Sequence, residues 1–364
     1  MDVRRFTVVR ALPGFFCCVA KGSGHRGFGL VELMIAVSLS LLLLGGVVAL
    51  FASSRKSYES NDHLARIQEN GRFALDQIVR DIRSAGYRGC AKEAPFANTL
   101  DTAANAMLWN FQLPAAGFQS TGTTWSPALD TALVSSAAAV NSDVLVLRAP
   151  DPDARAKRVT TLMGSASAEL TVEPVLPAYS AGDTLMVTDC NAVAVFEVTG
   201  YDDGDIAHAA NIKQSAASGS VVSAGNSTAD LGYAFREGAM VLPVRTVIYY
   251  VRRSTDAANG NSLWRRVGRN APEEVVEGVD SLQVLFGIDT DVDRIVNDYV
   301  TANSVTNWAT VISIRVGLLV RSIEQYGKNP DHAHVVLKQT IAAAGDNRER
   351  LLFHSTAALR NEAL

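Results

Sequence analysis

One stretch decides how the chain is built: residues 26–54, RGFGLVELMIAVSLSLLLLGGVVALFASS. From Leu33 to Ser54 it holds no charged residue. A helix of that length spans about 30 Å, which is enough to cross the hydrocarbon core of a bilayer. One acidic side chain, Glu32, stands at the entrance to this run. A charge near lipid is costly and usually has a partner, so Glu32 is a candidate functional residue.

The residues before the apolar run are basic. They comprise five cations and one carboxylate: Arg4, Arg5, Arg10, Lys21, Arg26 and Asp2. By the positive-inside rule this leader stays in the cytoplasm, so we expect everything beyond Arg55 on the exported side. The leader carries +4 and the whole chain −4, which leaves −8 for the residues after Gly27. That acidic balance argues against nonspecific binding of nucleic acid.

Other interpretations of the N-terminus fit less well. A secretory signal peptide has a shorter apolar core, followed by a cleavage site of small residues. Segment 22–27 matches the dinucleotide-binding pattern GxGxxG, but no strand precedes it and a membrane-length helix follows it. An ordinary signal anchor, with Glu32 in the headgroup region, is the alternative that the apolar run alone leaves open.

The helical pattern continues beyond the apolar run. Apolar residues recur at three- and four-residue spacing, and charged residues largely take the other positions. The apolar positions are Leu64, Ile67, Leu75, Ile78, Val79 and Ile82, and the charged ones are Arg66, Glu69, Arg72, Asp76, Arg80 and Asp81. We therefore expect one helix from about Phe28 to Ser84, about 85 Å long, with Gly86 as its C-terminal stop.

Short alternating runs replace the helical pattern after Gly86. Strands are expected from β-branched content and flanking turns at 143–148, 170–175, 184–188, 194–198, 240–251, 275–286 and 310–320. Their connections lack regular crossover helices, which favours antiparallel order. Segments 102–139 and 215–230, rich in small residues, are interpreted as surface insertions, the first with a short helix. The predicted fold class is α+β, a long N-terminal helix packed on an antiparallel β-sheet head.

The junction at Gly27 and Phe28, with Glu32 five places into the following chain, resembles the class III signal peptide of type IV pilins and type II secretion pseudopilins. In these families a prepilin peptidase cuts after the glycine, and the new terminal phenylalanine is methylated. The resemblance implies processing at Gly27 and Phe28. It also implies that Glu32 neutralises the N-terminal amine of a neighbouring subunit, and such buried charges are tolerable when paired.

Three later segments look like minor pilins of the PilW type. They are Asp81 to Cys90 (DIRSAGYRGC), Thr188-Asp189-Cys190 ahead of Phe196, and Leu359-Arg360-Asn361. The resemblance implies a low-abundance subunit that waits in the inner membrane, meets the pilus assembly platform there, and joins other minor pilins and the major pilin. It also implies a role in priming filament assembly. A minor pseudopilin of a type II secretion system is the nearest alternative, and a pilus-carried adhesin or DNA-binding tip module is another.

The expected organisation has three parts. Residues 1–27 form a cytoplasmic leader that is cleaved, residues 28–86 the transmembrane and stalk helix, and residues 87–364 a periplasmic or extracellular head. The sequence has no G-x-S-x-G elbow, H-E-x-x-H helix or phosphate-binding loop. We therefore expect a structural subunit and not an enzyme.

Two cysteines remain after removal of the leader. Of the four in the chain, two lie in the leader, which leaves Cys90 and Cys190. In an exported protein such a pair is expected to form a disulfide. Closing a loop of about 100 residues is worth roughly 4.7 kcal/mol in the chain-entropy model. Two separately buried thiols are the alternative.

Two charged clusters are candidate binding sites in the head. Asp289, Asp291 and Asp293 alternate along the chain, as in the first half of a calcium-binding loop. Arg294 stands where such a loop needs glycine, so calcium is only a possible cofactor and a solvated turn is the alternative. A second cluster could form a basic patch for DNA: Arg252, Arg253, Trp264, Arg265, Arg266 and Arg269. Alternating charges on strand faces explain it equally well, and nucleic acid is not among the expected partners.

Overall fold

The computed structural model describes residues 29–91, 94–102, 105–134, 138–174, 176–216, 220–256, 259–325 and 332–359. The chain forms two compact units that divide between Tyr58 and Glu59, inside the first helix. The leader, with Gly27 and Phe28, lies outside the described residues. The functional division into leader, helix and head is therefore untested and remains a prediction.

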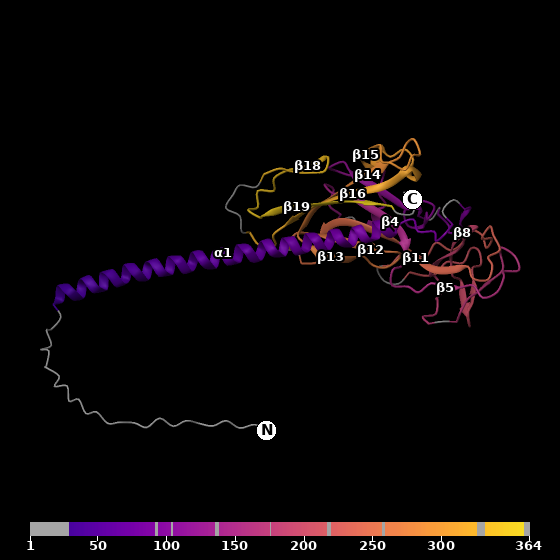
Figure 1. The fold of residues 1–364 in the computed structure, drawn as a ribbon, viewed down its shortest axis with the longest axis horizontal. Coiled ribbons are helices and arrows are strands. Elements are labelled where there is room, and N and C mark those ends of the chain that lie inside the picture. Colours follow the sequence, from indigo (N-terminus) through magenta and orange to yellow (C-terminus); the bar gives the residue numbers. More distant parts are fainter. Residues whose placement is uncertain are drawn as a thin grey trace, which may run out of the picture. The chain divides into compact units, whose positions relative to one another are not determined.

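The predicted long helix is present as α1 (Leu30–Ser84), labelled in Figure 1. At its end the Ala85 N–H donates to the Asp81 carbonyl at 3.0 Å, and Gly86 adopts a φ of 72°. A positive φ suits glycine because it has no Cβ. Gly86 therefore ends the helix, as the sequence predicts.

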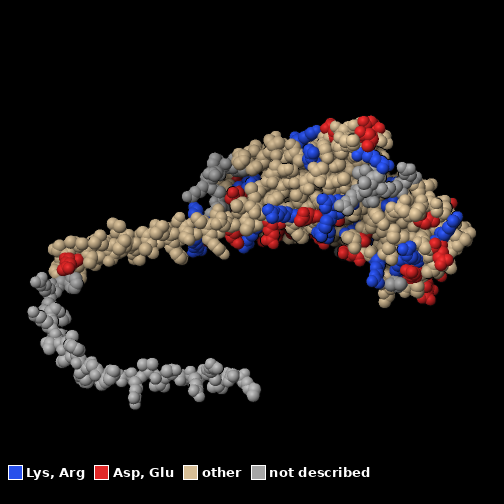
Figure 2. Space-filling model, viewed as in Figure 1, with Lys and Arg blue, Asp and Glu red and all other residues tan. Residues whose placement is uncertain are grey.

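The part of α1 before Arg55 lies in the first unit and is apolar on all sides apart from Glu32. It contains the only span among the described residues that is long and apolar enough to cross a membrane by length and composition. Figure 2 shows uncharged surface along this part, interrupted by one acidic patch near its start. Glu32 is the only charged residue between Gly29 and Ser54.

The part of α1 from Glu59 onward is amphipathic and packs within the second unit. Its buried positions are Ile67, Gly71, Ala74, Ile78, Val79, Asp81 and Ile82. At Gly71 the helix meets the Phe353 ring so closely that an added Cβ would lie 2.3 Å from a ring carbon. The predicted apolar face is confirmed, but Asp81 was wrongly placed on the solvent side.

Two main sheets make up the head. The larger follows the order β1 (Phe96–Asn98), β8 (Ala192–Glu197), β7 (Thr184–Asp189), β11 (Met240–Arg253), β4 (Val144–Pro150), β2 (Ala115–Ser120) and β3 (Trp125–Ser126). β5 (Lys157–Arg158) and β12 (Asn261–Val267) also pair with β11, and β12 pairs with β13 (Glu273–Glu277). The second sheet has the order β15 (Asp298–Val300), β14 (Val279–Ile288), β16 (Val311–Arg321) and β19 (Arg350–Ala358).

Smaller elements complete the head. They are α2 (Ala106–Trp109), α3 (Thr131–Val134), the sheet of β6 (Leu170–Thr171), β10 (Asp205–Ala207) and β9 (Gly200–Asp202), the hairpin of β17 (His334–Val336) and β18 (Gln339–Ile341), and the 3-10 turns η2 (Ala302–Ser304) and η3 (Trp308–Thr310). Strand pairs are antiparallel except β1 with β8. The predicted α+β class, with a mostly antiparallel head, is confirmed.

Strand β11 lies between two hydrophobic clusters, because successive side chains of a strand point to opposite faces of the sheet. Val247 and Tyr249 join the cluster that includes α1 and the second sheet. Ile248 and Tyr250 join a cluster on the other face that includes α2 and α3. The amphipathic part of α1 is therefore anchored to the core of the head.

Three sequence predictions need correction. The expected strand 275–286 is two strands, because Gly278 adopts a φ of 76° between β13 and β14. Segment 102–139 is not merely a surface insertion, since it supplies β2 to the large sheet and buries Leu108. Segment 215–230 likewise buries Asn226. Composition was misleading in both cases, because a few buried apolar or hydrogen-bonded residues are enough to hold a mostly polar segment in the head.

Candidate functional site

The membrane end of the chain is organised around the first turn of α1. Glu32 is exposed there, in the first turn of the helix, and the Leu33 N–H donates to the Gly29 carbonyl at 3.1 Å. A carboxylate in the first turn is favoured by the positive end of the helix dipole. Glu32 is thus compatible with the helix start and free to meet a group from outside the chain. Gly27 and Phe28, its predicted companions, lie outside the described residues.

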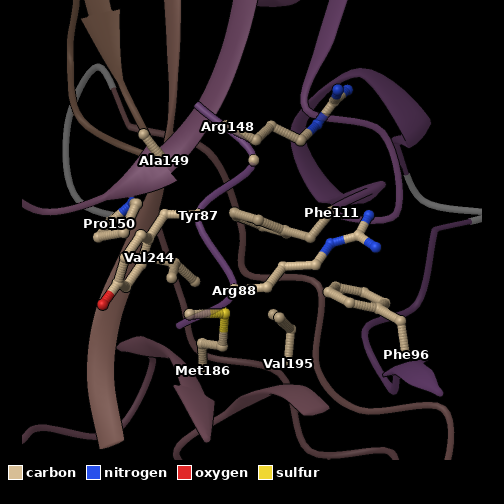
Figure 3. Close-up of a pocket in the computed structure, with 11 residues that line it drawn as sticks. Tyr87, Arg88, Phe96, Phe111, Arg148, Ala149, Pro150, Met186, Val195 and Val244 are labelled. Carbon is tan, nitrogen blue, oxygen red and sulfur yellow. The ribbon is translucent and has the colours of Figure 1, made fainter. Parts of the chain in front are cut away.

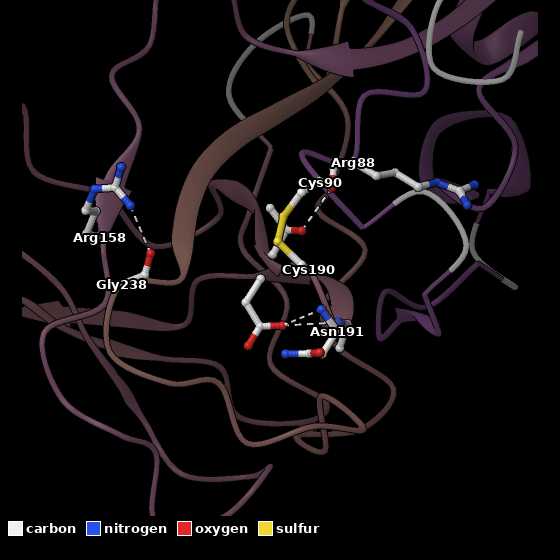
Figure 4. The surroundings of a disulfide bond; sticks show 9 residues. Arg88, Cys90, Arg158, Cys190, Asn191 and Gly238 are labelled. Carbon is white, nitrogen blue, oxygen red and sulfur yellow. Dashed lines mark hydrogen bonds between the residues drawn. A yellow bond between two sulfur atoms is a disulfide. The ribbon is translucent and has the colours of Figure 1, made fainter. Parts of the chain in front are cut away.

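The other end of α1 is tied to the head by a disulfide. Cys90 and Cys190 are bonded, with their Cα atoms 4.8 Å apart and a separation of 100 positions in the sequence (Figure 4). The Thr188 hydroxyl adds a hydrogen bond to the Arg88 carbonyl at 2.9 Å. The predicted disulfide is confirmed, and it joins the segment after α1 to the turn between β7 and β8.

A buried arginine that sequence reasoning missed also holds this region. Arg148 donates to the carbonyls of Leu113 and Met107 at 3.0 and 2.7 Å, and its own carbonyl accepts the Gly86 N–H at 2.9 Å. Burial lowers the pKa of Arg148 to about 10. The sequence feature that could have revealed it is an arginine inside an otherwise apolar strand pattern.

Next to Arg148 lies a small cavity of about 20 Å³ (Figure 3). The Arg88 guanidinium lies over the Phe96 ring at its edge, 4.8 Å from the ring centroid. A volume of that size has room for little more than one water molecule. The cavity is therefore a packing feature where α1 meets the sheet and not a ligand site.

Asp81 has a structural partner in the sheet. The Tyr249 hydroxyl donates to the Asp81 carboxylate at 2.6 Å, and both side chains are buried. Burial raises the pKa of Tyr249, and the nearby Asp81 charge adds to this. This bond fixes the rotation and register of α1 on the head.

The acidic turn brings its three carboxylates together. One oxygen from each of Asp289, Asp291 and Asp293 lies within 4.8 Å of the others. The two oxygens of Asp289 accept backbone N–H groups of Val292 and Arg294 at 2.7 and 2.8 Å. Although desolvation opposes the charge, these bonds lower the pKa of Asp289. The turn is thus a group of carboxylates that could hold a metal ion, with Asp289 also organising its backbone.

The arginines that could have formed a basic patch do not make one open surface. Arg266 donates to the carbonyls of Leu133 and Asn270 at 2.8 and 2.7 Å and is buried. Arg265 pairs with Glu273. The Arg252 guanidinium lies over the Trp264 ring, 3.4 Å from its centroid. These arginines therefore make separate contacts within the head.

Two family models match the chain. The model for the prokaryotic N-terminal methylation motif matches residues 22–48, which contain Gly27, Phe28 and Glu32. The model for the type IV pilus-assembly protein W, PilW, matches residues 248–361, from within β11 through β19. No curated protein and no solved structure matches the chain at a significant level.

A prepilin signal, a long apolar helix and a disulfide-tied β head define the class of the chain as a type IV pilin. Together with the match to PilW in the C-terminal third, these features support a minor type IV pilin that acts in pilus assembly. Proteins of this family are structural subunits. Membrane anchoring, incorporation into a pilus, and interaction with pilus components and the prepilin peptidase follow from the signal and the family.

Proposed function

We propose that the chain is made as a precursor that the prepilin peptidase cuts between Gly27 and Phe28 and then methylates at Phe28. The leader, residues 1–27, stays in the cytoplasm because it carries +4, and the head, residues 87–364, lies in the periplasm before assembly. The methylation-motif match over residues 22–48 supports this order. The mature chain acts as a structural subunit and not as an enzyme.

The position of Glu32 carries the proposal for assembly. It is the one charge between Gly29 and Ser54, in the first turn of a helix of membrane-spanning length. When such a helix leaves the bilayer and packs among sister helices, a lone carboxylate costs free energy unless a cation meets it. The methylated amine of Phe28 in a neighbouring subunit is a cation that lies at the same depth as Glu32. Pairing with Glu32 therefore favours helices that insert in register with their neighbours.

Processing and the role of Glu32 are tested on the same strains. Mass spectrometry of the mature protein should find methylated Phe28 at the N-terminus of the wild type and of Glu32→Gln. Incorporation into sheared pili should fall at least tenfold in Glu32→Gln and stay unchanged in Glu69→Gln, a matched change on an exposed position of α1. An uncut leader would overturn the processing step, and normal incorporation of Glu32→Gln would overturn the pairing.

The partners follow from where the mature helix goes. We infer that it joins other minor pilins and the major pilin at the inner-membrane assembly platform and helps to prime the filament. The apolar part of α1, residues 30–54, is exposed in the single chain and offers these neighbours a surface to cover. A deletion strain should lose twitching motility and keep type II secretion. The opposite result would assign the chain to a secretion pseudopilus.

For the acidic turn we propose calcium as the ion, because carboxylate oxygens are its preferred ligands. Asp291 and Asp293 are exposed and their carboxylates converge with that of Asp289. Calorimetry of the full chain in detergent should give a binding heat for calcium that Asp291→Ala abolishes, while Asp298→Ala beside the cluster keeps it. Equal heats in the wild type and Asp291→Ala would refute the site.

A further inference from the structure

Strand β19 forms one edge of the second sheet. It pairs with β16 in an unbroken antiparallel register from Ser313 opposite Ala358 to Arg321 opposite Arg350. No other strand in the described part of the chain pairs with it. One side of a nine-residue strand is therefore left without a strand neighbour.

The alternation of the ladder identifies which groups face that side. The Leu359 N–H donates to the Ile312 carbonyl at 2.9 Å, so the odd-numbered residues of β19 turn their backbone groups toward β16. The even-numbered residues Leu352, His354 and Thr356 turn theirs toward the edge. Their side chains are exposed, whereas Leu351 and Phe353 pack on the cluster that contains α1.

The edge lacks the devices that usually prevent strand addition. Natural edge strands carry proline, lysine, bulges or short lengths that discourage pairing. The sequence of β19, RLLFHSTAA, has no proline, glycine or lysine, and its register with β16 contains no bulge. An edge of this kind is a template for a further strand.

A groove lies beside the edge on the sheet face opposite α1. It has a volume of about 380 Å³ and is lined by Arg315, Leu337, Leu352, His354 and Thr356. Three of these are the alternate residues of β19 whose backbone groups face the edge. The hairpin of β17 and β18 covers the neighbouring part of the face, where an added Cβ at Gly317 would lie 2.8 Å from Val336. Side chains of an added strand thus have a place to bind.

The charge of this surface specifies the added strand. β16 and β19 contain three arginines and one histidine, and no carboxylate. Arg321 and Arg350 are paired with Asp280, at 3.1 and 2.8 Å. Arg315 instead lies over the Tyr299 ring, 3.9 Å from its centroid, and donates to the Thr356 hydroxyl at 3.1 Å. A carboxylate on the partner would complement it.

A second copy of this chain fits the surface poorly. Two-fold pairing of β19 with β19 about His354 would place two His354 side chains opposite each other and two Arg315 side chains on the same face. Such pairing brings no carboxylate to Arg315, because β16 and β19 contain none. A heterologous acidic strand supplies one.

We propose that the free edge of β19 binds an extended acidic strand of another pilus component by β-sheet addition. The strand hydrogen-bonds to Leu352, His354 and Thr356 and places a carboxylate on Arg315. The source of the strand rests on the proposed function, whereas the binding chemistry rests on the edge and groove alone.

The test uses the full chain in detergent micelles and a fluorescein-labelled nine-residue peptide that alternates valine with glutamate. Fluorescence anisotropy should show binding that weakens at least tenfold when lysine replaces glutamate in the peptide. Arg315→Glu should weaken binding of the glutamate peptide at least tenfold. The matched control Arg252→Glu alters an arginine that also lies over an aromatic ring, in the other sheet, and should leave binding unchanged.

Hydrogen exchange locates the contact. The bound peptide should slow exchange of the Leu352, His354 and Thr356 amides, and leave the odd-numbered amides of β19 at the protection that β16 already gives them. Equal binding of the two peptides, no binding up to millimolar peptide, or protection confined to other segments would overturn the proposal. So would concentration-dependent self-association of the full chain that Leu352→Lys abolishes. None of these results bears on processing or on Glu32, which are measured in cells.

Discussion

Removing the disulfide should weaken the head without unfolding it. In Cys190→Ser the bond to Cys90 is lost, but the Thr188 hydrogen bond to the Arg88 carbonyl and the Gly86 hydrogen bond to the Arg148 carbonyl remain. The segment after α1 is therefore still held at two points. The main loss lies in the unfolded chain, which gains the freedom that the closed loop denied it.

The magnitude follows from the loop that the bond closes. A separation of 100 residues corresponds to about 4.7 kcal/mol in the chain-entropy model, and measured losses commonly fall between about 2 and 5 kcal/mol. For a domain of more than 200 residues this lowers the melting temperature by about 10 °C. Cys90→Ser and the double variant should lose the same amount as Cys190→Ser, because each removes the same single bond.

Thermal unfolding of the oxidised and reduced full chain, followed by circular dichroism in detergent, measures the effect. Both cysteines are exposed, so dithiothreitol should reach the bond in the folded protein. Reductant should lower the melting temperature of the wild type to that of Cys190→Ser and leave the variant unchanged. The reasoning fails if the reduced and oxidised wild type melt at the same temperature. It also fails if the stability loss of the double variant is nearly the sum of the losses of the two single variants.

Three further predictions concern a buried carboxyl group between the sheets and two contacts near the end of α1. Burial raises the pKa of Asp143 from 3.8 to about 6 despite two backbone hydrogen bonds, so the protonated carboxyl group favours the folded state. In urea titrations the free energy of unfolding of the wild type should fall by up to about 3 kcal/mol relative to that of Asp143→Asn as the pH rises from about 4 to 6. Parallel pH profiles of the two proteins would contradict this. Tyr249→Phe leaves the buried Asp81 carboxylate without its 2.6 Å hydrogen bond and should cost about 1–3 kcal/mol in the same titration, whereas an exposed Tyr58→Phe control should cost nothing. Gly86→Ala, at a φ of 72°, should cost about 1 kcal/mol, and a stabilised variant would show that the helix end does not need glycine.

Features with local causes were predictable from the sequence. The extent of α1 follows from residue periodicity and from Gly86, whose conformation is a property of its own backbone. Strands such as β11 and β16 were found because β-branched residues are frequent in them. The disulfide was predictable because only two cysteines follow the leader, and the chemistry of an exported pair does not depend on the fold.

Features with distant causes were not predictable in this way. β19 was missed because Thr356 is its only β-branched residue, and its pairing with β16 spans loops that no local pattern describes. Asp81 looked like a solvent residue because its partner, Tyr249, lies 168 positions away. The burial of Arg148, and the separate contacts of the arginines that could have formed a basic patch, are likewise decided by which carbonyls and acids the fold brings near each side chain.

The sequence by itself determined that the chain has a prepilin signal, one membrane-length helix with a single carboxylate at its start, and a β-rich head. Each of these depends on residues that are neighbours in the sequence, because hydropathy, charge and helix-ending conformations act over a few positions. Only the tertiary structure decided where the amphipathic part of α1 binds the head, and that β19 is left as an open edge beside a groove. Those depend on side chains and strands far apart in the chain, whose pairing is fixed by the packing of the whole core.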